Sequence, residues 1–391
     1  MRKSFMPSSR GTIEPFHVME VMRAAEDRVA AGGEVLHLEV GQPSTGAASG
    51  VIEAAHNALD SDVLGYTTAK GLPVLRHRIS DHYRDWYGTE VDPDHVLVTM
   101  GASGGFVLAF IAAFEPGSRV VVPSPGYPCY RNALSALGAD VIDLPVDRST
   151  RFQPTPELLD PLLPLDGLVL ASPSNPTGTM LLPAELEALV GWCEGHGVRL
   201  ICDEIYHGIT YDQPAHSALE FGDSMVVVNS FSKYFSMTGW RLGWLVAPDD
   251  LVVNLERLAQ NFMISAPTLS QLAASAAFDC HHEFEANVDR YADNRRVLLD
   301  GLPTAGFTDL APADGAFYVW AECSAMGMGS QELCQRWLDE IGLAATPGVD
   351  FDPGRGEQFV RFSFAGSKSD MAEAVVRLRD WVKHNTGVLD K

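Results

Sequence analysis

The stretch SFSKYFSMTGWRLGW, residues 230–244, is the most informative part of this chain, because it places cations among apolar side chains. Lys233 stands between aromatic and hydroxyl residues, and the next cation, Arg241, follows within GWRLGW. Lysine and arginine are rarely buried without a partner. We therefore expect Arg241 to be buried beside an anionic group, and Lys233 to have a role that its surroundings explain.

Short apolar runs rich in β-branched residues alternate with helical patterns around this stretch. Six such runs are expected strands: VLVT (96–99), RVVV (119–122), LVLA (168–171), RLIC (199–202), VVVN (226–229) and WLVA (244–247). Helical patterns begin after Gly105, at Tyr130 and at Ala184. Continuous apolar strands that alternate with helices predict an α/β domain with a mostly parallel sheet covered on both faces.

The C-terminal third has a different pattern, which predicts a smaller α+β domain. Its long helical patterns and its two expected strands, 315–322 and 359–365, do not alternate regularly. We predict three parts: an N-terminal arm with part of the small domain at 1–45, a large ligand-binding domain at 46–280, and a small C-terminal domain at 281–391.

Composition excludes several classes of function. Hydrophobic residues make up 46% and charged residues 20%, and the net charge of −23 argues against binding to nucleic acid or anionic membranes. The six cysteines include no CxxC pair, and the histidines show no spacing typical of metal ligands. We expect a cytoplasmic, soluble protein with reduced thiols, no metal and no membrane span.

Polar or glycine-rich segments follow five of the expected strands. They are MGASGGF, SPGYP, SPSNPTGT, DEIYHG and SFSK. Ligands of open parallel sheets bind outside the carboxyl ends of the strands. The five segments are therefore expected to converge on one binding site.

Two of these segments can hold a phosphate group. In GASGG (101–105), small residues open a helix, whose free N–H groups and dipole favour an anion. Glycine-rich turns are also common for backbone reasons alone. Ser230 and Ser232 add hydroxyl donors, and Arg241 adds a fork that can grip phosphate.

The other segments suit a ring that carries an aldehyde. Asp203 can stabilise a protonated ring nitrogen, although a local capping role is the alternative. Asn175 and Tyr206 can donate hydrogen bonds to a ring oxygen, and Tyr127 can stack on the ring or merely pack. Lys233 can form an imine with an aldehyde. Aldehyde, phosphate and protonatable nitrogen together describe pyridoxal phosphate.

These motifs resemble those of the fold type I, class I and II aminotransferases. SPSNPTGT, DEIY and SFSKYFSMTGWRLGW occur in the family's order and approximate spacing. LEVGQPSTG, GYTTAKGLPVLR and FVRFSFA are similar to its more variable segments. The resemblance implies a large domain with a seven-stranded, mostly parallel sheet between helices, a smaller α+β domain, and a homodimer with shared active sites.

The resemblance also implies roles for single residues. Lys233 would bond to the cofactor and then move a proton, Asp203 would pair with the ring nitrogen, and Tyr206 would bind the ring oxygen; these three form the expected catalytic group. Asn175 would also bind the ring oxygen, and Tyr127 would stack on the ring. The expected phosphate ligands are Ala102, Ser103, Ser230, Ser232, Arg241, and Tyr66 from the second subunit.

Arg361 is the expected ligand of the substrate. The alternation in VRFSFA places it on the strand face opposite three apolar residues, where a solvated arginine is the alternative. The resemblance implies that Arg361 binds the α-carboxylate, with Asn175 and the backbone at Gly41 nearby. Phe5 and Phe16 can line an apolar side-chain pocket or pack the small domain.

We therefore expect transamination between an amino acid and a 2-oxo acid by a ping-pong mechanism. A carbon–sulfur β-lyase of the same fold would need the same lysine, aspartate and asparagine. A non-catalytic ligand sensor is an alternative of another class, which a retained Lys233 argues against. The amino donor and the acceptor stay open.

Overall fold

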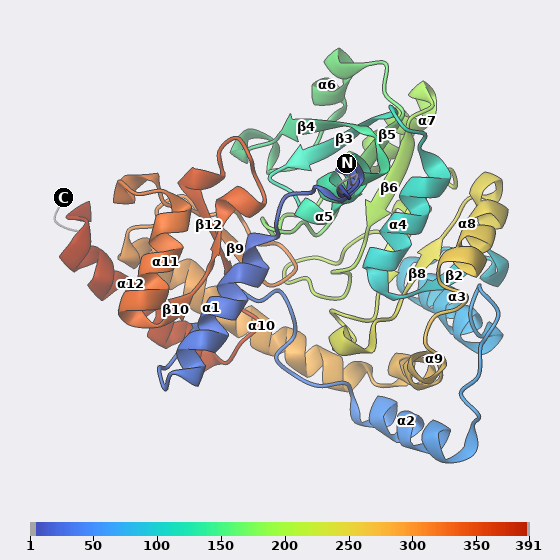
Figure 1. The fold of residues 1–391 in the computed structure, drawn as a ribbon, viewed down its shortest axis with the longest axis horizontal. Helices are drawn as coiled ribbons and strands as arrows, with labels where there is room; N and C mark the ends of the chain where they lie inside the picture. Colours follow the sequence, from blue (N-terminus) through green and yellow to red (C-terminus); the bar gives the residue numbers. More distant parts are fainter. Residues whose placement is uncertain (1–4, 389–391) are drawn as a thin grey trace.

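The computed structural model describes residues 5–388, and its largest element is a seven-stranded sheet with helices on both faces (Figure 1). The strand order is β2-β8-β7-β6-β5-β3-β4. The strands are β2 Val96–Thr99, β3 Arg119–Ser124, β4 Asp140–Pro145, β5 Gly167–Ala171, β6 Arg199–Asp203, β7 Val226–Ser230 and β8 Gly243–Val246. The predicted α/β class is confirmed.

The sheet is mostly parallel, and β8 is antiparallel to both of its neighbours. The six expected strands are present, with β5 and β8 each beginning one residue earlier than predicted. The sequence did not predict β4, because this edge strand is polar on its exposed positions, including Asp140 and Asp143. Edge strands commonly carry such charges. A search for continuous apolar runs therefore misses them.

Helices cover both faces of this sheet. The helices in this part of the chain are α2 Ser49–Ser61, α3 Pro73–Tyr87, α4 Gly101–Ala113, α5 Pro128–Leu137, α6 Pro156–Leu159, α7 Pro183–His196, α8 Asp249–Phe262 and α9 Thr268–Ser275, of which α2 packs on α9 rather than on the sheet. In β3, Val121 belongs to one apolar cluster, whereas Val120 and Val122 belong to the cluster on the other face. Burial on both faces is the reason why the strands read as continuous apolar runs.

The glycine-rich segment after β2 is not a turn that precedes a helix but the first turn of α4 itself. Gly101 has a φ of +72°, and a Cβ atom at this position would lie 2.8 Å from the guanidinium of Arg241. Only glycine meets both conditions without strain. The start of α4 and Arg241 are therefore in direct proximity.

A second group of elements lies on the other side of the molecule; its C-terminal elements are orange and red in Figure 1, and its N-terminal helix α1 is blue. Its strands are β9 Tyr318–Glu322, β11 Thr346–Pro347 and β12 Phe359–Ser363, in the antiparallel order β11-β12-β9, and β1 Leu36–His37 pairs with β10 Leu343–Ala344. Its helices are α1 His17–Ala30, α10 His281–Gly301, α11 Ser330–Ile341 and α12 Lys368–Asn385. The division at residues 45 and 280 stays a prediction, which the pairing of β1 with β10 supports.

The topology brings the five polar segments together. Strands β3, β5, β6 and β7 are parallel, and β2 runs in the same direction because two antiparallel pairings with β8 separate it from β7. All five carboxyl ends therefore lie at one edge of the sheet. Within residues 5–388, no helix combines the length and the apolar character needed to cross a membrane, and no group of side chains there is arranged to bind a metal ion.

Candidate active site

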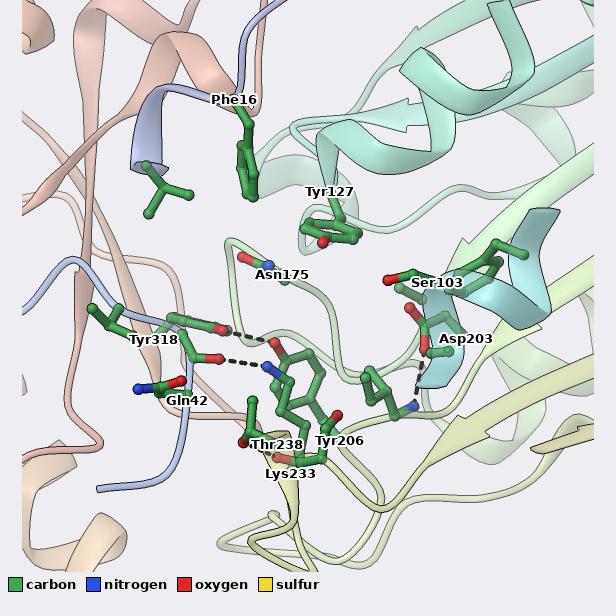
Figure 2. Close-up of a pocket in the computed structure, with 18 of the residues that line it drawn as sticks. Phe16, Gln42, Ser103, Tyr127, Asn175, Asp203, Tyr206, Lys233, Thr238 and Tyr318 are labelled. Carbon is green, nitrogen blue, oxygen red and sulfur yellow. Dashed lines mark hydrogen bonds between the residues drawn. The ribbon is translucent and has the colours of Figure 1, made fainter. Parts of the chain in front are cut away.

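A cavity of about 500 Å³ opens at this edge of the sheet, and both Lys233 and Asp203 line it (Figure 2). Its volume falls in the range of small-molecule sites, roughly 300–1,000 Å³. The predicted residues that line it are Gly41, Ala102, Ser103, Tyr127, Asn175, Asp203, Tyr206, Ser232, Lys233, Arg241 and Arg361. The strand-end segments thus converge, as the sequence predicted.

Lys233 follows β7 by a short loop and is only partly exposed. Its Nζ donates a hydrogen bond to the carbonyl oxygen of Gly41 and lies 5.5 Å from the ring centroid of Tyr206. Burial lowers the pKa of Lys233 to about 8; the nearby Arg361 adds to this shift, and Asp203 opposes it. A larger share of this amine than of an ordinary lysine is therefore neutral near physiological pH, and the neutral form is the nucleophilic and basic one.

Asp203 is the last residue of β6 and is buried. Its Oδ1 accepts a hydrogen bond from the N–H of Ile205 at 3.0 Å, and its Oδ2 accepts one from the hydroxyl of Tyr130. Burial raises the pKa of Asp203 to about 6, while these hydrogen bonds act in the opposite direction. Asp203 thus both accepts the local hydrogen bond from Ile205 and lines the cavity. A buried carboxylate of this kind favours a cationic group on a ligand.

Tyr130 is a site residue that sequence reasoning missed. It lies on α5, three residues after Tyr127, and its ring packs edge-on against that of Tyr127 with centroids 5.5 Å apart. Residues three apart share a helix face. Extending the helical pattern back to Pro128 would have placed both rings on the same side. In Figure 2 the Tyr127 ring stands over the space between Asn175 and Ser103.

Arg361 on β12 is 2% exposed, so the solvated alternative is wrong. Its guanidinium carbon lies 4.4 Å from the ring centroid of Tyr318 and 4.7 Å from that of Phe351. Nη1 donates to Oδ1 of Asn175 at 2.9 Å, and Nη2 donates to the carbonyl of Glu39 at 2.6 Å. Among the ion pairs of residues 5–388, none includes Arg361. A buried cation without an anion is prearranged for an anionic ligand.

Arg241 lines the cavity, but its predicted burial is wrong. Its side chain is exposed, and Nη1 donates to the carbonyl of Thr238 at 3.0 Å. Arg241 has a φ of +52° at the end of a short 3-10 turn and stays exposed, whereas Trp244, three residues later, is buried. No carboxylate of the described residues pairs with it. It is a free cation beside the N-terminus of α4, where anions bind readily.

Two predicted residues lie outside the cavity. The hydroxyl of Ser230 hydrogen-bonds with Oγ of Ser232 at 2.9 Å and with the carbonyl of Leu242 at 3.0 Å. The Ser230 hydroxyl therefore contacts Ser232, which lines the cavity. Contrary to expectation, Ser230 does not line the cavity itself. Tyr66, on the loop after α2, is 83% exposed and does not line the cavity of its own chain.

The charged residues that line the cavity are Lys233, Arg241, Arg361 and Asp203. Three cations against one acid make the cavity locally basic in a chain of net charge −23. One wall of the cavity is apolar and includes Phe16, Val18, Met19, Met22 and Val40. Phe16 thus lines the cavity, whereas Phe5 is fully exposed. The cavity suits a small molecule with anionic groups and one apolar part.

Comparison with known proteins agrees with this geometry. The family model described as aminotransferase class I and II matches residues 33–378. The chain belongs to this family. The aminotransferase is 48% identical to the valine–pyruvate aminotransferase of Mycobacterium tuberculosis. The alignment spans 380 residues and covers 95% of this chain and 97% of the relative. It is 29% identical to the aspartate aminotransferase of Pyrococcus horikoshii, over 91% of this chain and 93% of that protein.

Solved structures show the same fold. The crystal structure of an aminotransferase from Mycobacterium tuberculosis superimposes with a TM-score of 0.96 at 47% identity, covering 97% of this chain and all of that one. The structure of the aspartate aminotransferase of Thermus thermophilus with maleate superimposes with a TM-score of 0.91 at 28% identity, covering 96% of this chain and all of that one. The predicted fold type I architecture and transamination are thereby confirmed. None of these relatives is named as an eliminating enzyme or a ligand sensor.

Proposed function

We propose that this aminotransferase binds pyridoxal phosphate in the cavity and moves the α-amino group of an apolar amino acid, first of all valine, to pyruvate. The family uses this cofactor. The observation that carries the proposal is that Lys233 and Asp203 line a single cavity whose other charged residues are two arginines without carboxylate partners among the described residues. The relative named valine–pyruvate aminotransferase supports the choice of substrates.

The phosphate group fits one end of the cavity. Arg241 offers a free guanidinium, and Ser232 offers a hydroxyl. Ala102 and Ser103 lie in the first turn of α4, where backbone N–H groups have no partner within the helix. The Arg241 guanidinium lies next to Gly101 at the start of this helix, and Ser232 lines the same cavity, so we assign the phosphate to these donors.

The ring fits between the remaining groups. Asp203 would face the ring nitrogen, because its burial makes a neighbouring positive charge favourable. Asn175 uses Oδ1 to accept from Arg361 and keeps its amide hydrogens for a ring oxygen. Tyr206, whose hydroxyl lies 2.7 Å from that of Tyr318, would bind the same oxygen, and Tyr127 would cover one ring face.

When bound, pyridoxal phosphate supplies an aldehyde that takes up the amino group and a ring that accepts the electron pair released at Cα. The chain contributes binding, orientation and proton transfer. Lys233 is the group that removes the proton from Cα of the amino acid, because its lowered pKa increases the share of neutral amine that can accept a proton in the cavity. Its hydrogen bond to the carbonyl of Gly41 keeps Nζ directed into the cavity.

Arg361 would fix the other end of the substrate. Its planar guanidinium, held between the rings of Tyr318 and Phe351, can bind the α-carboxylate through two parallel hydrogen bonds. With the carboxylate on Arg361 and the amino group near Lys233, the side chain is directed toward the apolar wall. That wall offers no cation to a second carboxylate, so apolar donors are favoured over acidic ones.

The proposal is tested by following nitrogen rather than activity alone. Purified enzyme with pyridoxal phosphate, ¹⁵N-valine and pyruvate is expected to yield ¹⁵N-alanine and the 2-oxo acid of valine in equal amounts, as measured by mass spectrometry. Aspartate in place of valine should react much more slowly. Release of free ¹⁵N-ammonia without labelled alanine would show elimination or deamination and would contradict the proposal.

We also propose a homodimer in which Tyr66 of each subunit reaches the phosphate site of the other. Its support is the exposure of Tyr66 together with neighbouring apolar residues, including Val63 and Val74. We expect a mass of two chains by light scattering, and a Tyr66→Phe variant that stays dimeric but binds pyridoxal phosphate several-fold more weakly. A monomeric, active wild type would contradict the shared site.

Cytoplasmic location is proposed as well, because the six cysteines are free thiols.

A further inference from the structure

The apolar wall of the cavity comes mainly from helix α1, which lies on the side of the second group of elements that is toward the middle of the molecule in Figure 1. Val18, Met19 and Met22 project from its first turns, and Phe16 directly precedes it. If the proposed function holds, this wall meets the substrate side chain. The position of the first turn of α1 then decides how much space lies beyond Cβ of the substrate.

The first turn of α1 has no cap of its own. The residue at the N-cap position is Phe16, whose side chain cannot accept a hydrogen bond. Asp350 takes over this role from a distant part of the chain: Oδ1 accepts from the N–H of His17 and Oδ2 from that of Val18, both at 2.9 Å. Its side chain is 3% exposed. A carboxylate here satisfies two free N–H groups and complements the helix dipole.

The segment that carries Asp350 also touches two other parts of the site. Phe351, the next residue, packs its ring on the guanidinium of Arg361, and its carbonyl accepts from the N–H of Gly126 at 3.0 Å. Gly126 directly precedes Tyr127. Two consecutive residues thus contact the apolar wall, the predicted carboxylate ligand and the loop that carries the aromatic ring.

The C-terminal half of α1 is held independently of Asp350. Ala25 packs in a small cluster with Leu338 and Ala344. Arg28 donates to the carbonyl of Asp339 at 3.0 Å and to that of Glu34 at 3.2 Å. Loss of the Asp350 carboxylate would therefore release the first turn and leave the rest of the helix attached.

We propose that Asp350 is a positioning residue that sets the selectivity for apolar substrate side chains. It does not line the cavity itself and acts through α1, whose first turn it fixes against the substrate. This inference rests on the proposed function only in that the substrate is an amino acid bound with its side chain toward α1.

The test compares two donors that differ only beyond Cβ. In Asp350→Ala, kcat/KM for valine is expected to fall about tenfold, the size of a lost helix cap, mainly through KM. The value for alanine should change less than about threefold, since its methyl group is too short to depend on the wall. Asp350→Asn is a milder variant, because an amide has one acceptor oxygen for two N–H groups. Its kcat/KM for valine should lie between those of wild type and Asp350→Ala.

A second readout does not depend on activity. Hydrogen exchange followed by mass spectrometry should show faster exchange in residues 17–20 of Asp350→Ala, with residues 25–30 unchanged. Ser367→Ala is the matched control: Ser367 caps α12 by accepting from the N–H of Asp370 at 3.2 Å and does not line the cavity. It should lower the melting temperature without changing the valine-to-alanine ratio.

The proposal is overturned if both Asp350 variants keep the wild-type ratio of valine to alanine, or if both donors lose activity equally. This outcome is separate from failure of the proposed function. If wild-type enzyme does not use valine at all, the ratio is measured with leucine or another active apolar donor, and the exchange experiment stands unchanged.

Discussion

Replacing Lys233 with alanine is expected to lower the rate of amino transfer by about 10⁴-fold, the upper range for loss of a positioned general base. The cavity offers no second amine, because the other cations that line it are Arg241 and Arg361, whose guanidinium groups carry hydrogen-bond donors and no acceptor. Folding should be little affected, since the Nζ makes only one hydrogen bond, to the carbonyl of Gly41. The measurement is the formation of ¹⁵N-alanine from ¹⁵N-valine and pyruvate.

The lowered pKa of Lys233 gives this prediction a second readout. The amine is protonated below its pKa of about 8 and neutral above it, so its reaction with the aldehyde of pyridoxal phosphate should speed up as pH rises through that value. Borohydride reduction followed by peptide mapping should locate the cofactor on Lys233. Lys368→Ala, at an exposed position that does not line the cavity, is the control and should change neither labelling nor rate. Residual activity above about one per cent in Lys233→Ala would contradict the assignment.

The parts of this fold that the sequence predicted share one physical cause. Strands β3, β5, β6 and β7 are buried on both faces, so their apolar runs are unbroken and easily recognised. Because parallel strands end at the same edge, the residues after them could be assigned to one site without knowledge of the packing. This is why Asp203 and Lys233 were placed correctly in a common cavity.

The parts that the sequence did not predict depend on tertiary packing. Arg241 lies in an apolar stretch, yet its backbone is left-handed and its side chain is exposed. Met19 and Met22 show an ordinary helical pattern, which does not reveal that α1 lies over the cavity. The bond between Asp350 and the start of α1 joins residues 332 positions apart. No local pattern carries that information, because nothing near Phe16 indicates that the cap comes from elsewhere.

Arg361→Ala is expected to raise KM for valine and for pyruvate together, by roughly 10²–10³-fold, the cost of removing one partner of a buried charge pair. Both substrates carry the carboxylate that Arg361 is proposed to bind, so a shared increase is the specific signature. The turnover number should fall much less than KM rises, because Lys233 and Asp203 stay in place. Steady-state kinetics with each substrate varied in turn measures both constants.

Two further variants separate the carboxylate role from structural damage. Arg361→Lys keeps the charge but loses the planar fork that fits between Tyr318 and Phe351, so its KM should lie between those of wild type and Arg361→Ala. Arg295→Ala removes another partly buried arginine, which donates to the carbonyl of Ala313 at 2.7 Å and does not line the cavity. It should leave KM unchanged.

Isobutylamine, which is valine without its carboxylate, should react equally slowly with wild type and Arg361→Ala. A KM for valine that stays at the wild-type value in Arg361→Ala would show that the carboxylate binds elsewhere, since no other buried guanidinium lines this cavity in the described chain.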